Sequence, residues 1–349
     1  MTTWSWWLAA LMALGAAKAG AEEDTAWSVQ PSGVTVRLRG VSAVSDQVAW
    51  ASGDKGTFLR TVDGGKTWHS GVVPDAEGLD FRDVDAFSAS TAYLLSIGPG
   101  AASRIYKTTD GGAHWTLQFT NPLPTGFFDA MAFWDERHGA AFSDPVDGRF
   151  RVAVTEDGGT TWRLLPPAAL PPALPGEGGF AASGTSLAVY GNTHVWFGTG
   201  GPQARVFHSA DRGRSWGVVT TPLATGDGAG IFSLSFWNER QGIAVGGNYH
   251  READPAGNLA LTRDGGRTWT RISGAGPAGY RSAVARLPGG RGPVLLAVGP
   301  SGADLSEDGG QRWTPWGHTG FHAVSAAPSG AAWAVGEGGR VARLVRPSR

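Results

Sequence analysis

The chain has 349 residues, of which 54 are Gly, 21 are Pro, 16 are Trp and none is Cys, and its formal net charge is −1. A hydrophobic fraction of 41% excludes a disordered chain, and the absence of Cys excludes disulfides, thiol nucleophiles and Cys-ligated metal centres. The balanced charge gives no support for bulk electrostatic binding of nucleic acid, so no nucleic-acid partner is expected. Abundant Gly together with Trp indicates many tight turns between short, well-packed strands.

The N-terminus has the pattern of a secretory signal. An apolar run from Trp4 to Gly15 is too short to span a bilayer comfortably, and small residues follow it. We therefore predict a signal peptide at 1–21, with cleavage after Ala19 or Ala21 left open, and one domain at 22–349. The mature protein is expected to be exported, periplasmic or extracellular, without stable insertion in a membrane.

One octapeptide recurs six times, at intervals close to 50 residues, and this period is typical of a repeat fold. Its pattern is Ser/Thr-x-Asp-x-Gly-x-Thr-Trp, with small departures. The Asp can accept backbone N–H groups within its own turn, the Gly permits φ > 0, and the Trp can be buried between neighbouring units. We assign a structural role to Asp63, Asp110, Asp157, Asp211, Asp264 and Asp308, and to Trp68, Trp115, Trp162, Trp216, Trp269 and Trp313.

Each repeat has room for four short strands, with the octapeptide turn between the third and the fourth. This organisation predicts an all-β fold, a β-propeller. The segment after the sixth octapeptide supplies three more strand-like runs, and residues 27–30 have the Trp-led pattern of a fourth strand. We therefore predict seven blades, with the last blade closed by the N-terminal strand, and six blades as the alternative.

The octapeptide resembles the Asp-box, or BNR repeat, of several propeller families. Together with the runs 53–68, 142–150 and 244–249, it makes the chain similar to the photosystem II stability/assembly factor family and its bacterial relatives. The resemblance implies a non-catalytic, seven-bladed binding scaffold that takes part in the assembly or stability of a protein complex. It implies no photosynthetic partner by itself.

The alternative function is a carbohydrate-active enzyme, because sialidases also carry Asp-boxes. The chain lacks their Phe-Arg-Ile-Pro motif, and the nearest string begins at Phe81. Of the Tyr residues, only Tyr249 has a nearby Glu, Glu252, as a sialidase nucleophile would need. Other glycosidases remain open, because facing carboxylates cannot be identified from sequence. No cofactor or metal motif is present, so we expect neither a cofactor nor a metal.

The predicted binding site lies at the mouth of the central channel, where the first strand of each blade begins. Aligning these strands places Arg39, Arg82, Arg281 and His322 in four successive blades, and Phe128, Ala181 and Phe232 in the others. The result is a basic arc opposite an apolar arc. It suits an acidic segment of a membrane or envelope protein, which arginines can pair with, although solvated strand ends are the alternative. We expect a monomer.

Two polar loops between the second and third strands are the second candidate. They contain Asp144, Asp147 and Arg149 in one blade, and Asn248, Tyr249, His250 and Arg251 in another. They could form a wall of the site, with ordinary polar turns as the alternative. The Pro-rich stretch 166–175 is expected to be a stiff loop, or an arm that binds a partner.

Overall fold

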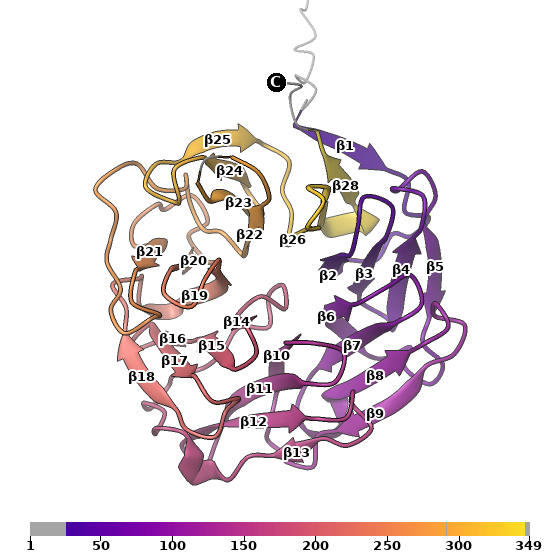
Figure 1. The fold of residues 1–349 in the computed structure, drawn as a ribbon, viewed down its shortest axis with the longest axis horizontal. Coiled ribbons are helices and arrows are strands. Elements are labelled where there is room, and N and C mark those ends of the chain that lie inside the picture. Colours follow the sequence, from indigo (N-terminus) through magenta and orange to yellow (C-terminus); the bar gives the residue numbers. More distant parts are fainter. Residues whose placement is uncertain (1–25, 291, 346–349) are drawn as a thin grey trace, which may run out of the picture.

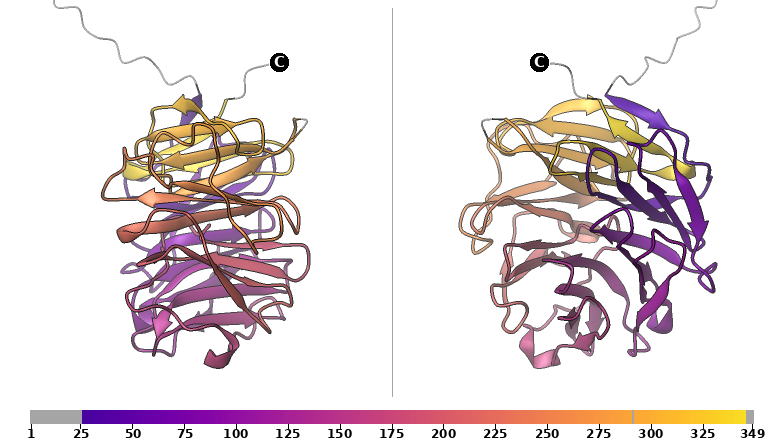
Figure 2. Two further views of the ribbon diagram at one scale, coloured as in Figure 1. Left: turned by 90° about the vertical axis from the view of Figure 1, so that its left-hand side faces the viewer. Right: turned by 45° about the vertical axis from the view of Figure 1, so that its right-hand side comes forward.

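The computed structural model describes residues 26–290 and 292–345, so the predicted signal peptide lies outside the described residues. Seven four-stranded antiparallel sheets are arranged in a ring (Figure 1), which confirms the seven-bladed propeller; the six-bladed alternative is wrong. Figure 2 shows the sheets from the side, stacked around the ring as successive blades. Within these residues, none of the helices has the length and apolar character needed to cross a bilayer.

The first four blades follow the chain in order. Blade 1 has β2 (Leu38–Ala43), β3 (Ala49–Gly53), β4 (Thr57–Thr61) and β5 (His69–Val72). Blade 2 has β6 (Asp80–Ala86), β7 (Ala92–Ile97), β8 (Arg104–Thr108) and β9 (Thr116–Thr120). Blade 3 has β10 (Phe128–Phe133), β11 (Gly139–Val146), β12 (Arg149–Thr155) and β13 (Arg163–Leu164). Blade 4 has β14 (Leu187–Tyr190), β15 (His194–Gly198), β17 (Arg205–Ser209) and β18 (Gly217–Thr220).

The remaining blades include the one irregular sheet. Blade 5 has β19 (Gly226–Phe236), β20 (Gly242–Asn248) and β21 (Leu259–Thr262), and its fourth strand is β16 (Gly200–Gly201), which comes from blade 4. Blade 6 has β22 (Ala283–Leu287), β23 (Val294–Gly299), β24 (Gly302–Ser306) and β25 (Thr314–Gly317). Blade 7 has β26 (Ala323–Ala326), β27 (Ala332–Val335), β28 (Val341–Leu344) and β1 (Trp27–Gln30). Three short 3₁₀ helices are η1 (Gly100–Ala102), η2 (Pro167–Ala169) and η3 (Glu337–Gly339).

The expected outer strand of blade 5 is reduced to one residue pair. After the octapeptide turn, the main chain of the described residues pairs with β21 only through the isolated bridge between Leu261 and Thr270. The sheet is completed instead at its inner edge, where β16 pairs with the long β19. The prediction of a regular fourth strand after every octapeptide is therefore wrong for blade 5.

The N-terminal strand closes the ring. β1 pairs antiparallel with β28, from Trp27 opposite Leu344 to Gln30 opposite Val341. The amide oxygen of Gln30 accepts the indole N–H of Trp68 at 3.0 Å and of Trp333 at 3.2 Å, which joins blade 7 to blade 1. Full closure removes the exposed sheet edges of an open ring, which could otherwise pair with other chains.

Buried residues fill the spaces between neighbouring blades. Trp27 occupies one such space and is packed 4.7 Å from the ring of Phe321. Trp115, from the octapeptide of blade 2, packs edge-on against Phe58 of blade 1, with ring centroids 5.0 Å apart. Because aromatic side chains bury large apolar areas, these tryptophans act as wedges between blades.

The octapeptide turns satisfy their own polar groups. In the first turn, the Asp63 carboxylate accepts the backbone N–H and the hydroxyl of Thr67, at 2.9 and 2.6 Å. The hydroxyl of Thr61 donates to Asp63 and accepts the N–H of Gly65. These donors, led by Thr67, lower the pKa of Asp63 to about 2. Gly65 has φ +85°, a conformation in which other residues are strained.

Along the channel, side chains of one inner strand accept backbone N–H groups of the next. Ser42 accepts the N–H of Ala86, and the Asp83 carboxylate accepts that of Met131 at 2.7 Å. Burial raises the pKa of Asp83 to about 8 and that of Asp85 to about 6. These bonds hold the inner strands in a fixed order around the channel.

Candidate functional site

A cavity of ≈ 450 Å³ lies on the face opposite the octapeptide turns, where the inner strands begin. We call it the mouth cavity. Four of the residues that line it are bulged: the strand register shifts at Arg39, Arg82, Asp129 and Phe232. A β-bulge re-aims its side chain and ends regular pairing, so these bulges turn four side chains from the sheet towards the mouth.

Arg39 is the unpaired cation of this cavity. No acidic side chain and no hydrogen-bond acceptor pairs with it within residues 26–290 and 292–345, and its buried Nε has no partner. Burial, and next the charge of Arg82, lower the pKa of Arg39 to about 10. The side chain is therefore charged at neutral pH, in a place where its charge is poorly solvated. Such a group is stabilised by an anion that enters the cavity.

Arg82 and His322, which the sequence also places in the arc, have partners. Arg82 Nε donates to Asp80 at 2.8 Å, and its Nη1 donates to the carbonyl of Ala181 at 3.0 Å. His322 Nε2 lies 2.7 Å from Glu337. Burial and the charge of Arg39 lower the pKa of His322 to about 4, although Glu337 acts in the opposite direction, so this ring is neutral at pH 7. The mouth therefore carries one uncompensated cation rather than a broad basic surface.

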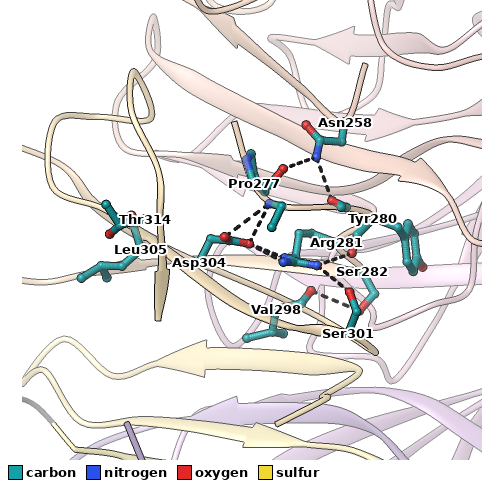
Figure 3. A network of polar contacts seen from close by, with 12 residues as sticks. Asn258, Pro277, Tyr280, Arg281, Ser282, Val298, Ser301, Asp304, Leu305 and Thr314 are labelled. Carbon is teal, nitrogen blue, oxygen red and sulfur yellow. Dashed lines mark hydrogen bonds and ion pairs between the residues drawn. The ribbon is translucent and has the colours of Figure 1, made fainter. Parts of the chain in front are cut away.

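The prediction that Arg281 belongs to this arc is wrong. Arg281 is 2% exposed, and its guanidinium forms a buried ion pair with Asp304, with Nε 2.6 Å from Oδ2 (Figure 3). It also donates to Ser301 at 3.1 Å and to the carbonyl of Tyr280. In this blade the register is displaced by one residue, so that Tyr280 and Ser282 line the mouth and Arg281 points into the blade.

The same displacement occurs in blade 3. Phe128, which was expected to face the channel, is fully buried in the core, and Asp129 takes the bulged position. Because Phe127 and Phe128 are both Phe, the sequence does not distinguish the register that places Phe127 at the mouth from the register that places Phe128 there. The structure selects the one in which Phe127 lines the mouth.

Aromatic rings form the apolar side of the mouth cavity. Phe232 stacks on Phe180, with ring centroids 3.9 Å apart, and contacts Tyr280 edge-on at 4.7 Å. The ring centroid of Tyr249 lies 6.1 Å from that of Phe232, and Tyr249 is 43% exposed. Ala181 and Phe232 thus lie where the sequence places the apolar arc, whereas the contributions of Phe180 and Tyr280 were missed.

Two carboxyl groups lie at the edge of this apolar side. Asp129 is 1% exposed, and its Oδ2 has no hydrogen-bond partner. Burial, and next the charge of Asp144, raise the pKa of Asp129 well above its usual range. Asp144 accepts the N–H of Gly179 at 2.7 Å, and burial raises its pKa as well. Asp129 was not predicted, because the register of its strand could not be read from the sequence.

The two polar loops contribute only in part. Asp144 and Tyr249 line the mouth cavity. Arg149 donates to the carbonyl of Leu170, and so holds the Pro-rich stretch against the blade as a loop. Asn248 is buried and donates to the carbonyl of Asp227. The others are absent from the mouth lining: Asp147 lies near Arg151, His250 near Asp227, and Arg251 near Asp254.

Metal ligands do not gather at this site. Across the part of the chain that the structure describes, no group of three or more His, Cys, Asp or Glu residues could hold a metal ion. The arrangement of one unpaired guanidinium, protonatable carboxyls and aromatic rings favours recognition of an anionic and partly apolar group.

Sequence comparisons identify similar proteins. No family model matches the chain. It is 24% identical to the photosystem II assembly lipoprotein Ycf48 of Synechococcus sp. (strain CC9902), over 64% of this chain and 58% of that protein's length. It is also 24% identical to the photosystem II assembly protein Ycf48 of Synechococcus sp. (strain JA-2-3B'a(2-13)), over 56% of this chain and 78% of the relative. The chain is similar to Ycf48 proteins. The resemblance noted in the sequence is thereby confirmed.

Solved structures agree with the sequence relatives. A structure described as YCF48 bound to D1 peptide superposes with a TM-score of 0.64 and 17% identity, over 92% of this chain and 97% of that one. At this identity the match establishes the Ycf48-like propeller fold. The chain spans 58% of the first curated relative, so what that whole protein does is carried over only as a proposal.

Proposed function

We propose that this protein is a non-catalytic propeller that binds a protein segment in its mouth cavity and so acts as an assembly or stability factor for a complex at the cell envelope or membrane. The observation that carries the proposal is Arg39, a charged, poorly solvated side chain without a partner in a cavity of ≈ 450 Å³. An unpaired buried charge is costly to the folded protein, which is consistent with a site that is completed by a ligand.

The similar proteins support the nature of the ligand. Two relatives are named photosystem II assembly proteins, and one similar structure contains a peptide of D1. A segment with a carboxylate and apolar side chains would pair with Arg39 and pack on Phe180, Phe232 and Tyr280. We therefore propose an acidic segment of a membrane or envelope protein as the partner, and export of the mature chain as the location.

The proposal is tested by crosslinking and pull-down from envelope fractions. We expect Arg39→Glu and Arg39→Met to lose the partner that the wild-type protein captures. Arg286→Glu is the matched control, since Arg286 is exposed on β22 and is not part of the mouth lining. Thermal unfolding of each variant shows that it is folded. Equal capture by wild type and both Arg39 variants would refute the site.

Location is tested separately. N-terminal sequencing of the mature protein is expected to begin at residue 20 or 22, after cleavage at Ala19 or Ala21. Recovery of the intact chain from the cytoplasm alone would contradict export.

A further inference from the structure

A second hollow, of ≈ 440 Å³, adjoins the mouth cavity and has a floor made of glycine backbone. We call it the glycine groove. Its floor residues are Gly178, Gly179, Gly200, Gly201, Gly226 and Gly228. Three short segments lie side by side there: Gly178 bridges to Gly200, and β16 pairs with the first residues of β19. The floor is thus a small sheet made largely of glycines.

Part of this glycine content is required by packing. A Cβ on Gly200 would lie 2.5 Å from the ring of Phe180, and one on Gly230 would lie 2.4 Å from the Cα of Gly200. Gly226 is different, because a Cβ there would meet nothing within 4 Å, although its φ of +110° excludes most residues. The floor is therefore open at Gly226, where the main chain of a ligand can approach it closely, whereas His250 and Tyr249 lie over Gly228.

The groove and the mouth form one continuous surface, since Gly179, Phe180 and Tyr249 line both. Asp129 lies directly beneath this junction. A Cβ on Gly179 would come within 2.6 Å of its Oδ2, the buried oxygen that lacks a hydrogen-bond partner. The junction therefore lies next to a buried polar atom that lacks a hydrogen-bond partner.

The two ends of this surface carry opposite charges. Arg39 lies in the mouth, and the Asp227 side chain, 99% exposed, lines the groove. The Oδ2 atom of Asp227 lies 3.6 Å from Nε2 of His250, whose side chain is half-exposed. A ligand that spans both hollows would therefore meet a cation at one end and an anion at the other.

We propose that the mouth cavity and the glycine groove together hold an extended polypeptide segment, with an acidic group at Arg39 and a basic group at Asp227. The inference rests on the proposed function and adds to it the conformation and the charge order of the partner. An extended chain suits a floor made largely of glycines, because its backbone can lie against them while alternate side chains point away.

The test is selection from a displayed library of random 12-residue peptides. Wild-type protein is expected to enrich peptides with an acidic and a basic residue at a fixed separation. Asp227→Lys should weaken binding of those peptides roughly fivefold or more, and should enrich peptides with a second acidic residue in place of the basic one. Glu239→Lys, an exposed change on the opposite face, is the matched control and should leave selection unchanged.

The outcomes separate the two proposals. If Arg39→Met abolishes enrichment while Asp227→Lys enriches the same peptides as the wild-type protein, the groove is not used. The inference is then refuted, but the mouth site stands. Unchanged affinity after trimming the peptide to its acidic end leads to the same conclusion. If wild type and Arg39→Met enrich the same peptides, or if neither enriches any, the proposed function falls together with the inference.

Discussion

Replacing Arg39 with Met is expected to stabilise the folded protein while removing its binding function. The substitution deletes a charge that has no partner, and the methionine keeps an apolar stem of similar reach. Natural binding sites often contain such groups, which lower stability in the free protein and are compensated when the ligand is present.

The magnitude follows from the pKa of Arg39. A fall from 12.5 to about 10 corresponds, at about 1.4 kcal/mol per pH unit, to about 3 kcal/mol of unfavourable free energy for the charged folded state. Because the side chain keeps some contact with solvent, this value is an upper limit. We expect Arg39→Met to raise the free energy of unfolding at pH 7 by about 1–3 kcal/mol.

Urea unfolding followed by Trp fluorescence measures this change. Arg281→Met is the matched control, because it removes the same side chain from a buried ion pair and leaves Asp304 without its cation. That variant should lose about 3–5 kcal/mol. A clear loss of stability in Arg39→Met, comparable to that of Arg281→Met, would refute the view that Arg39 is unpaired in the free protein.

Three further predictions concern the ring itself. Gln30→Ala should lower the free energy of unfolding by about 1–3 kcal/mol, since two buried indole N–H groups lose their acceptor; an unchanged urea midpoint contradicts this. Asp83 has a raised pKa, so its contribution to stability is present below pH 4 and is lost as the pH rises to about 8; Asp83→Asn should flatten this decline, and parallel pH profiles would refute it. Phe128→Ala should cost about 3–5 kcal/mol and Phe127→Ala clearly less, and the reverse order would refute the register of β10.

The architecture was predictable because it depends on local, repeated chemistry. Each octapeptide specifies one turn, and the spacing of these turns leaves room for the strands between them. Even ring closure could be read, because Trp27 repeats the pattern of the wedge tryptophans. The outer edge of blade 5 could not be read, because Thr270 follows its octapeptide in the same way as the first residues of regular outer strands.

The residues of the site could be predicted from the sequence only in those blades where the register of the inner strand could be predicted. A bulge changes which side chain faces the mouth without changing the sequence pattern, and the choice between Phe127 and Phe128, or between Tyr280 and Arg281, depends on packing with the neighbouring blade. The sequence also overestimates the positive charge of the mouth, because Arg82 is paired with Asp80, two residues earlier on β6, and with the carbonyl of Ala181, and His322 is paired with Glu337.

Ring closure by β1 also sets an order of events for the growing chain. Gln30 and the indole of Trp333 are separated by 303 residues, so the strand that completes the ring is made long before its partner. Closing so long a loop is slow, and until then β28 presents an open edge. The folding rate of this protein should therefore depend on how long its N-terminal strand stays unpaired, and excess free peptide of residues 26–32 should compete with closure during refolding.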